Sequence, residues 1–379
     1  MRVTFVLPTV GMSGGIRVVA IYAKALAARG HEVTLVSPPP RAVPFRRKVK
    51  SFLKRKGWPG DPPPPASHLD GSGLDHHVLD RCRPVTDDDV PDADVVIATW
   101  WETAEWVNAF GAGKGAKAYF VQGYEVFPYL PIDRVHRSYR LPMHKIVVAK
   151  WLANVMAQRY GDPFVDVVPN SVDRKLFFAE GRGKRPVPTV GFIYSADPIK
   201  GIDIMLQAIG RLRQKFSNLR VISFGATEPQ PPLALDSQTE FHCAPRQQDI
   251  RLFYAQCDAW IISSTTEGSP LPALEAMACR TPVVATRTGW PEEAITSGEN
   301  GVLVDVGDVN GLVSGVESVL SLPDVEWRRL SRNAYETTAP GSWEESARKF
   351  ESALLHACRR SMDGEIAGRS ASWRGADTT

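Results

Sequence analysis

The sequence predicts an α/β protein with two doubly wound domains, each built on a parallel sheet. Short β-branched runs alternate with segments of helical periodicity along almost the whole chain, which is the pattern of repeated β-α units. The 379 residues exceed one ordinary core and suit two domains of roughly 150 to 200 residues each. The hydrophobic share of 43% and the charged share of 23% are typical of a globular protein. Two such domains imply a cleft, where ligands usually bind.

Six strand-like runs occupy the first half of the chain, and six more repeat the scheme in the second half. The first-half runs are 3–7, 32–37, 94–100, 117–122, 145–150 and 165–170. The second-half runs are 189–195, 219–225, 239–244, 259–264, 282–286 and 301–305. One segment lacks a regular pattern, since residues 57–75 are rich in Pro and Gly and are predicted to form a mobile loop.

The domain boundary is predicted in the stretch VVPNSVD, where a strand ends in turn-forming residues. This places the first domain at 1–168 and the second at 169–340. The run SWEESARKFESALLHA has an apolar face at helical spacing, so a helix over 341–358 is expected to pack on its own domain or to cross back to the first. Residues 359–379, rich in Ser, Gly and Arg, are predicted to be a flexible tail.

Composition disfavours several classes of protein. Nothing approaches an apolar span of about 18 residues, so no transmembrane helix is expected, and the start MRVTFVLPTVGMSGG does not resemble a signal peptide. The five cysteines are scattered and show no C-x-x-C spacing, which indicates neither a disulfide framework nor a zinc site. A reducing cytoplasm is the simple inference. The net charge of +3 is too small to indicate a nucleic-acid partner.

A basic segment, FRRKVKSFLKRK at 45–56, has two interpretations. Phe45, Val49, Phe52 and Leu53 follow helical spacing, and seven basic residues surround them. Such a helix suits an anionic membrane surface. It equally suits a solvated helix that rests its apolar stripe on the domain, and the sequence leaves both open.

The first β-α unit contains a Gly-rich turn, PTVGMSGG, ahead of a helix predicted at 16–29. Gly11, Gly14 and Gly15 would let a phosphate or a polar sugar group approach the helix N-terminus, although a purely structural turn explains them equally well. The turn is not the G-x-G-x-x-G pattern, and the second strand ends in Ser37 rather than in an acidic residue. A nicotinamide-dependent enzyme is therefore disfavoured.

A second candidate site lies in GFIYSADPIKGID, where Lys200 directly precedes a helix beginning near Gly201. The helix macrodipole already makes this end positive, so a lysine there is unfavourable for the helix. An anion shared between the lysine and the helix end would remove the conflict. The alternative is a lysine exposed to solvent.

The stretch TEGSPLPALEAMACRTPVVAT places Glu267 and Glu275 eight positions apart. Ser269 is a suitable N-cap and Pro270 a suitable first helical residue, which predicts a helix over 270–279. Glu267 would then lie at the mouth of the helix and Glu275 in its second turn. This arrangement suits a ligand that carries both phosphate and hydroxyl groups.

These residues resemble a known family. The pattern E-G-x-x-L-P-x-L-E-A-M-A followed by T-P-V-V-A-T is similar to the E-x7-E signature of the family-4 retaining glycosyltransferases, which have the GT-B fold. The likeness extends to the SGG turn with RGHEV and to PNSVD, PIKGID, TGWPEEAI, ENGVLVDVGD and SWEESARKF. It implies two Rossmann-like doubly wound domains facing a central cleft, with the C-terminal helix crossing back to the N-terminal domain. The second domain would hold the nucleotide sugar, and the first would hold the acceptor.

The resemblance also implies roles for individual residues. Glu275 would accept hydrogen bonds from the ribose hydroxyls and Glu267 from the sugar hydroxyls, while Lys200 would neutralise the diphosphate leaving group. Lys200 and Glu267 are thus the expected catalytic residues. Backbone N–H groups near Ser269 to Leu271 and the turn at Gly14 and Gly15 would lie close to the phosphates and the transferred sugar. Front-face attack with retention is implied, with no metal and no cofactor.

Three positions depart from the family pattern. Tyr194 stands where many relatives have an arginine, so either Arg246 assists the diphosphate or binding relies on Lys200 and helix dipoles. Gln122, with Glu125 nearby, stands where relatives often have a histidine beside the sugar, which suits a deoxyhexose. Arg280 replaces a usual glycine.

The expected function is therefore a hexosyl or deoxyhexosyl transfer from a nucleoside-diphosphate sugar to a polysaccharide, lipopolysaccharide or lipid-linked glycan. The expected location is the cytoplasm, with or without peripheral attachment to the inner face of the membrane. Two alternatives remain at this point. One is a nucleotide-sugar epimerase of similar fold, and the other is a nucleotide-sugar binding protein without turnover, which Tyr194 makes conceivable.

Overall fold

The computed structural model describes residues 1–40 and 66–366, and the chain divides into two compact units. Unit 1 comprises Met1–Val147, Val155–Val168 and Ala347–Thr379, and unit 2 comprises Val148–Asn154 and Pro169–Ser346. The passage from Val168 to Pro169 coincides with the predicted domain boundary. The grouping of 148–154 with unit 2 was not predicted.

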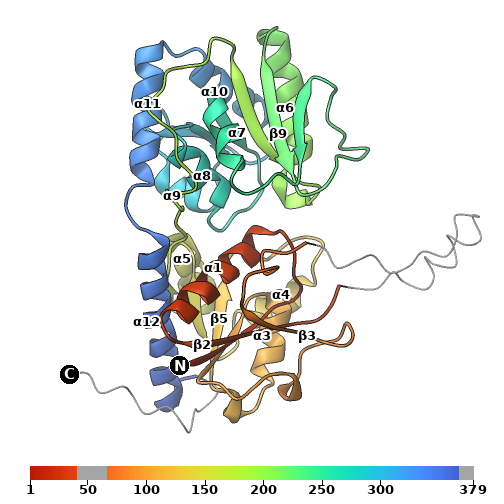
Figure 1. The fold of residues 1–379 in the computed structure, drawn as a ribbon, viewed down its shortest axis with the longest axis vertical. Helices are drawn as coiled ribbons and strands as arrows, with labels where there is room; N and C mark the ends of the chain where they lie inside the picture. The colour runs from red at the N-terminus through yellow and green to blue at the C-terminus, as the bar shows by residue number, and fades with distance from the viewer. Residues whose placement is uncertain (41–65, 367–379) are drawn as a thin grey trace, which may run out of the picture. The chain divides into compact units, whose positions relative to one another are not determined.

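Unit 1 contains a seven-stranded parallel sheet in the order β3-β2-β1-β4-β5-β6-β7 (Figure 1). Its central strands are almost entirely apolar and buried, as expected for a parallel sheet covered on both faces. The strands are β1 (Arg2–Val6), β2 (Glu32–Ser37), β3 (Asp75–Val78), β4 (Val95–Ala98), β5 (Ala116–Val121), β6 (His144–Val147) and β7 (Asp166–Val167).

Within the described residues, the helices of this half of the chain are α1 (Gly14–Ala28), α3 (Trp101–Asn108), α4 (Ile132–Ser138) and α5 (Lys150–Tyr160). Short 3-10 turns occur at Asp87–Asp89 and Ala112–Lys114. α1 starts two residues earlier than predicted because Ser13 is its N-cap, with the side-chain oxygen accepting a hydrogen bond from the N–H of Ile16 at 3.4 Å.

The last helix, α12 (Trp343–Met362), packs its second part on unit 1. Phe350 stacks on Tyr22 with ring centroids 4.4 Å apart and meets Phe120 edge-on at 5.0 Å. This contact accounts for the apolar face read from the sequence and confirms the return of the helix to the N-terminal domain. The predicted tail is wrong at its start, because 359–362 remain helical and Ile366 is buried. Residues 367–379 lie outside the described residues.

Unit 2 contains a six-stranded parallel sheet in the order β10-β9-β8-β11-β12-β13 (Figure 1). The strands are β8 (Thr189–Tyr194), β9 (Arg220–Gly225), β10 (Thr239–Cys243), β11 (Ala259–Ile262), β12 (Val283–Thr286) and β13 (Gly301–Val304). The helices are α6 (Ile202–Lys215), α7 (Ile250–Gln256), α8 (Leu271–Ala278), α9 (Trp290–Ala294), α10 (Val309–Leu320) and α11 (Asp324–Thr337). Trp327 of α11 and Val284 of β12 belong to the core that these elements enclose.

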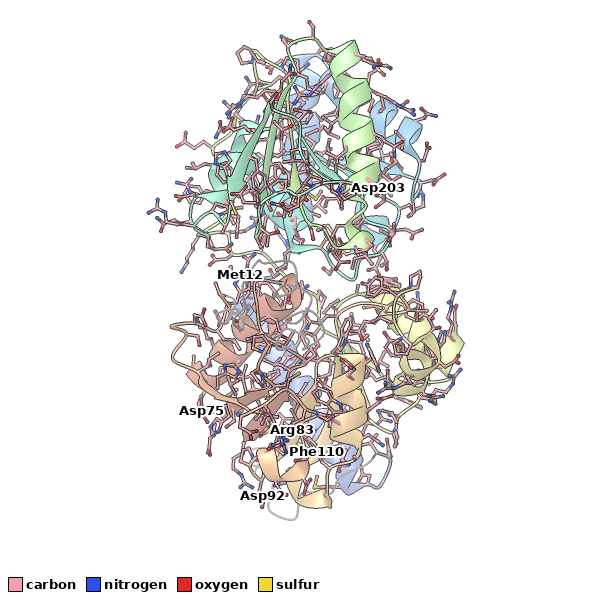
Figure 2. All side chains as sticks on the ribbon, turned by 90° about the vertical axis from the view of Figure 1, so that its right-hand side faces the viewer. Met12, Asp75, Arg83, Asp92, Phe110 and Asp203 are labelled. Carbon is pink, nitrogen blue, oxygen red and sulfur yellow. The ribbon has the colours of Figure 1, made fainter. Side chains whose placement is uncertain are left out.

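All twelve predicted strands are present, and β3 was missed. The sequence DHHV of β3 is polar and largely exposed, because this strand lies at the sheet edge and pairs only with β2. Asp75, labelled in Figure 2, begins this outermost strand, at the end of the segment predicted to be a loop. An edge strand without buried side chains carries no hydrophobic alternation to recognise.

Two sequence predictions concern membranes. The basic segment 45–56 lies outside the described residues, so its interpretation stays a prediction. Within 1–40 and 66–366, no helix combines the length and apolarity that crossing a membrane requires.

Candidate functional site

Lys200 lies on a turn that is held against the end of β11. The turn Pro198–Lys200 is a short 3-10 helix, and Gly201 follows it with a φ of +60° at the start of α6. A Cβ atom on Gly201 would lie 2.2 Å from the carbonyl oxygen of Ser263, so only glycine fits. The hydroxyl of Ser263 donates to the carbonyl oxygens of Lys200 and Gly201 at 3.0 and 2.9 Å. These contacts fix the backbone from which the lysine side chain projects.

The Lys200 ammonium group forms an ion pair with Glu267. The distance from Nζ to Oε1 is 2.7 Å, and Ser264 donates its hydroxyl to the same oxygen at 2.6 Å. The Glu267 side chain is 10% exposed and that of Lys200 is 38% exposed. The two expected catalytic residues are therefore in contact, while the anionic ligand expected beside Lys200 stays a prediction. No hydrogen bond to Oε2 of Glu267 comes from the part of the chain that the structure describes.

The backbone around Glu267 is tightly packed by the segment TGWPEEAI. Gly289 has a φ of +68°, and a Cβ atom there would lie 2.3 Å from the carbonyl oxygen of Glu267. The carbonyl oxygen of Gly268 accepts hydrogen bonds from the N–H of Trp290 at 2.9 Å and from the indole of Trp151 at 3.1 Å. This segment is part of the family resemblance, and in the structure it positions the backbone at Glu267 and Gly268.

Helix α8 begins at Leu271 with Pro270 in the cap position, so the prediction of Ser269 as N-cap is wrong. Pro270 has an extended backbone (ψ 112°), which leaves Ser269 one residue outside the helix. Ser269 is 8% exposed, and its hydroxyl has no partner among the described residues. Its carbonyl oxygen accepts a hydrogen bond from Nδ2 of Asn170 at 3.1 Å. A buried hydroxyl beside a helix start, where N–H groups lack intrahelical acceptors, suits an anionic ligand.

Glu275 lies in the second turn of α8, as predicted, but it is buried. Glu275 is 4% exposed, and its Oε2 accepts a hydrogen bond from the hydroxyl of Tyr254 at 2.9 Å. Tyr254 lies on α7 and is fully buried. The sequence did not indicate this partner, because the two residues are on different helices. Glu275 therefore has a structural contact in addition to the ligand contact expected of it.

Gly14, Gly15 and Gln122 lie together in unit 1. A Cβ atom on Gly15 would lie 3.5 Å from Nε2 of Gln122, whereas one on Gly14 would have nothing within 4 Å. The protein itself therefore does not require glycine at either position. The small residues leave the start of α1 uncovered beside the Gln122 amide, as a ligand site there would need.

Arg246 is not paired with Lys200 or Glu267, the predicted residues beside which it was expected to act. Its side chain is 74% exposed and forms an ion pair with Asp249 at 2.7 Å; within the described residues it forms no ion pair or hydrogen bond with Lys200 or Glu267. Tyr194 is a packing residue, since it is 2% exposed and its ring meets Phe241 edge-on at 5.9 Å.

Arg280, the third departure, adopts the left-handed conformation with a φ of +59°. Glycine would adopt this conformation without strain. Two contacts offset the strain for arginine, because its guanidinium group lies 4.1 Å from the Tyr335 ring centroid and Nε donates to the carbonyl oxygen of Ala179 at 3.2 Å. The substitution is thus explained by packing within unit 2.

Glu125 is a buried carboxyl group that the sequence only noted as near Gln122. It is 2% exposed, and Oε2 accepts hydrogen bonds from the N–H of Trp101 at 2.9 Å and from the hydroxyl of Tyr119 at 3.2 Å. Its own N–H donates to the Tyr139 hydroxyl at 2.8 Å, so it anchors the loop after β5. Burial raises the pKa of this carboxyl to about 8.

The raised pKa of Glu125 gives a testable pH dependence. The folded protein keeps this proton while the unfolded chain loses it near the ordinary pKa of 4.5, so the free energy of unfolding should fall as pH rises from about 4.5 to about 8. The neutral Glu125→Gln variant should match the natural protein at pH 5 and exceed it at pH 8.5 by several kcal/mol, at about 1.4 kcal/mol per pKa unit. Urea unfolding at several pH values measures this. Parallel pH profiles for the two proteins would contradict protonation in the fold.

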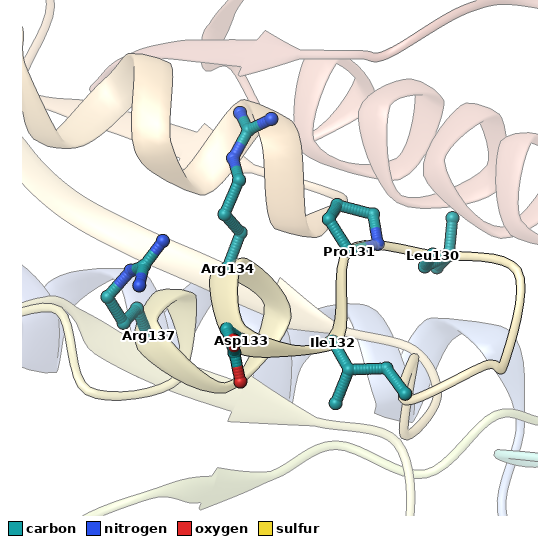
Figure 3. A pocket seen from close by; sticks show the side chains of 6 residues that line it. All are labelled: Leu130, Pro131, Ile132, Asp133, Arg134 and Arg137. Carbon is teal, nitrogen blue, oxygen red and sulfur yellow. The ribbon is translucent and has the colours of Figure 1, made fainter.

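A cavity of about 440 Å³ lies at the start of α4 (Figure 3). Arg134, one of its lining residues, is held by Glu105 at 2.5 Å and lies over the Trp101 ring. None of the predicted site residues lines this cavity, which is formed by Leu130, Pro131, Ile132, Asp133, Arg134 and Arg137.

Comparison with protein families shows that residues 187–321 fit the model described as "Glycosyl transferases group 1". This region contains Lys200, Glu267 and Glu275. A "D-inositol 3-phosphate glycosyltransferase" of Mycobacterium marinum is 29% identical over 226 residues, which are 54% of this chain and 47% of the relative. An "MMP alpha-(1->4)-mannosyltransferase" of Mycolicibacterium hassiacum is 34% identical over 178 residues, which are 44% of this chain and 42% of the relative. The chain spans about half the length of the curated relatives it matches.

Solved structures resemble nearly the whole chain. Sucrose-phosphate synthase from Thermosynechococcus elongatus superimposes with a TM-score of 0.69 at 16% identity, covering 96% of this chain and 100% of that structure. Anabaena HepE, solved in complex with UDP and glucose, gives a TM-score of 0.71 at 16% identity, covering 94% and 99%. At 16% sequence identity, the similarity to these solved structures establishes the fold of this chain. The two parallel sheets of seven and six strands are those of the GT-B fold.

Proposed function

We propose that this chain, which belongs through residues 187–321 to the group 1 glycosyl transferases, transfers a sugar from a nucleoside-diphosphate sugar to an acceptor glycan. The observation that carries the proposal is the contact between Lys200 and Glu267 beside the start of α8. A cation, a carboxylate and a helix N-terminus converge there. A sugar diphosphate needs all three, because it presents anionic phosphates next to hydroxyl groups.

The proposed reaction retains the anomeric configuration. Lys200 stabilises the negative charge that develops on the departing diphosphate, and the N–H groups at the start of α8 add to this stabilisation. Glu267 accepts hydrogen bonds from the sugar hydroxyls through Oε2, and Glu275 binds the ribose. The acceptor hydroxyl attacks on the face of the leaving phosphate, which takes its proton. Positioning and charge stabilisation supply the catalysis, and no metal or cofactor is needed for it.

The donor and acceptor classes follow from weaker signals. HepE was solved with UDP and glucose, and the relatives are named as glycosyl and mannosyl transferases, which favours a nucleoside-diphosphate sugar as donor. Gln122 beside Gly15 replaces a histidine expected near the sugar, which suits a deoxyhexose. The acceptor is proposed to be a polysaccharide, lipopolysaccharide or lipid-linked glycan.

A screen of nucleoside-diphosphate sugars with the purified full chain tests this function. Free nucleoside diphosphate should appear slowly through donor hydrolysis and faster when a suitable acceptor is added. An epimerised donor without released nucleotide would identify the protein as an epimerase instead. Donor binding with neither hydrolysis nor transfer, over a panel of acceptors, would identify a binding protein.

The basic segment 45–56 is proposed to attach the enzyme to anionic lipid at the cytoplasmic face. Replacing Arg46, Arg47, Lys54 and Arg55 with glutamine should reduce sedimentation with vesicles that contain anionic lipid, because each basic residue near such a surface contributes about 1 kcal/mol. Neutral vesicles are the control. Equal sedimentation of the two proteins with anionic vesicles would favour a solvated helix.

A further inference from the structure

Two histidines and one aspartate from distant parts of the sequence meet in unit 1. His144 begins β6, Asp166 begins β7, and His356 lies on α12. Nε2 of His144 and Nδ1 of His356 are each 2.9 Å from Oδ2 of Asp166. The three atoms all lie within 4.8 Å of one another. None of the three residues belongs to the predicted donor site.

We propose that His144, Asp166 and His356 form a binding site for a divalent transition-metal ion such as Zn²⁺. Two imidazoles and one carboxylate are ligands that zinc accepts, with bonds of about 2.0 to 2.2 Å. A tetrahedral ion with such bonds needs donor atoms roughly 3.3 Å apart, and the carboxylate oxygen is already 2.9 Å from both nitrogens. The two histidine nitrogens are at most 4.8 Å apart. A small rotation of the His356 side chain, which is 41% exposed, would bring them to the required distance.

Burial favours a defined geometry at this site. The His144 side chain is completely buried, and its ring meets the His356 ring nearly edge-on with centroids 4.8 Å apart. Because His144 and Asp166 lie on adjacent paired strands, two of the three ligands are held by the sheet. The third arrives on the helix that returns to unit 1. A bound ion would therefore tie α12 to the sheet edge, and a water molecule would complete the coordination.

Arg360 controls access to the site through the His144 tautomer. Its guanidinium group, which can only donate, lies 3.1 Å from Nδ1 of His144. Nδ1 is therefore the acceptor, and Nε2 carries the hydrogen that Asp166 accepts. A metal ion needs the lone pair of Nε2, so the proton must move to Nδ1 and Arg360 must release the ring. Arg360 has other acceptors, Glu365 at 2.9 Å and the carbonyl oxygen of Phe164 at 3.1 Å, which can retain it.

The test is metal binding by the full chain, purified without a histidine tag. Titration with ZnCl₂ in a calorimeter should give one site per chain, and Co²⁺ should give visible absorption bands of a low-coordinate ion. His356→Gln should weaken Zn²⁺ binding at least tenfold, and so should Asp166→Asn. Because His356 is partly exposed, its variant is expected to fold even if the Asp166 variant does not. His77→Ala is the matched control, since His77 pairs with Asp75 at 2.9 Å on the surface.

Arg360→Gln provides a second measurement. It should tighten Zn²⁺ binding about tenfold. In the natural protein, Nδ1 of His144 must lose its hydrogen bond from Arg360 before it can take up the proton from Nε2, and the variant removes this step. In the natural protein, one equivalent of Zn²⁺ should also raise the unfolding temperature, and a chelator should reverse the rise. Absence of stoichiometric binding, or equal weakening by His77→Ala and His356→Gln, would overturn the site. Unchanged affinity in Arg360→Gln would overturn the gating by Arg360. Neither result bears on sugar transfer, which is assayed separately.

Discussion

Replacing Lys200 with methionine is expected to lower the rate constant for sugar transfer by about 10²- to 10³-fold, the cost typical of removing one preorganised charge or donor from a transition state. The backbone that carries the lysine side chain is held against Ser263 at the end of β11, so the ammonium group projects from a fixed position. The affinity for the donor should fall less than the rate, because charge on the leaving diphosphate develops fully only in the transition state. Steady-state kinetics with the donor found in the screen measures both.

Arg246→Met is the control for the Lys200 variant. Arg246 is exposed and paired with Asp249, so its loss should change the rate by less than about threefold, as for most surface substitutions. A rate loss in Arg246→Met as large as that in Lys200→Met would show that Arg246 assists the diphosphate, in place of the arginine that many relatives have at the position of Tyr194. A Lys200→Met variant that keeps its full rate would refute the role of Lys200. Unfolding temperatures should be compared, because Lys200→Met removes the ion-pair partner of Glu267.

The second large effect is expected at Glu275. Substitution with alanine would leave a cavity inside the domain and remove the carboxylate that accepts from the Tyr254 hydroxyl, because Glu275 is 4% exposed. Glu275→Gln is therefore the informative variant, since it keeps the shape and an acceptor for Tyr254 while removing the charge. Donor affinity should fall about 10- to 100-fold, which corresponds to the roughly 1.5 to 3 kcal/mol of a hydrogen bond to a charged group. Calorimetric titration with the donor or with its nucleoside diphosphate measures the loss.

Tyr254→Phe separates the two roles of Glu275. It removes the hydrogen bond at 2.9 Å but leaves the carboxylate in place, so it should lower stability by about 1 kcal/mol and change donor affinity little. If Glu275→Gln binds the donor as tightly as the natural protein, Glu275 is a structural partner of Tyr254 and not a ribose ligand.

Most of the strands were predictable because they are short, buried runs rich in β-branched residues, which is a local property, although β7 and β10 are only partly buried. β3 escaped prediction because an exposed edge strand has no apolar side to reveal it. The helix α8 was predicted within one residue at each end, although the cap moved from Ser269 to Pro270. The end of α12 was misplaced because a Ser- and Arg-rich composition does not reveal that Arg360 pairs with Glu365 and that Ile366 is buried.

By itself, the sequence determined the two parallel-sheet units, the passage between them at Val168 and the positions of Lys200, Glu267 and Glu275 on their turns and helix. These features depend on periodicity and turn chemistry over a few residues. The tertiary structure alone decided which of these residues touch. Lys200 meets Glu267 across 67 positions, Glu275 is buried against Tyr254, and His356 reaches Asp166 across 190 positions. Such contacts follow from strand order and helix packing, which bring distant residues together, and no local pattern records them.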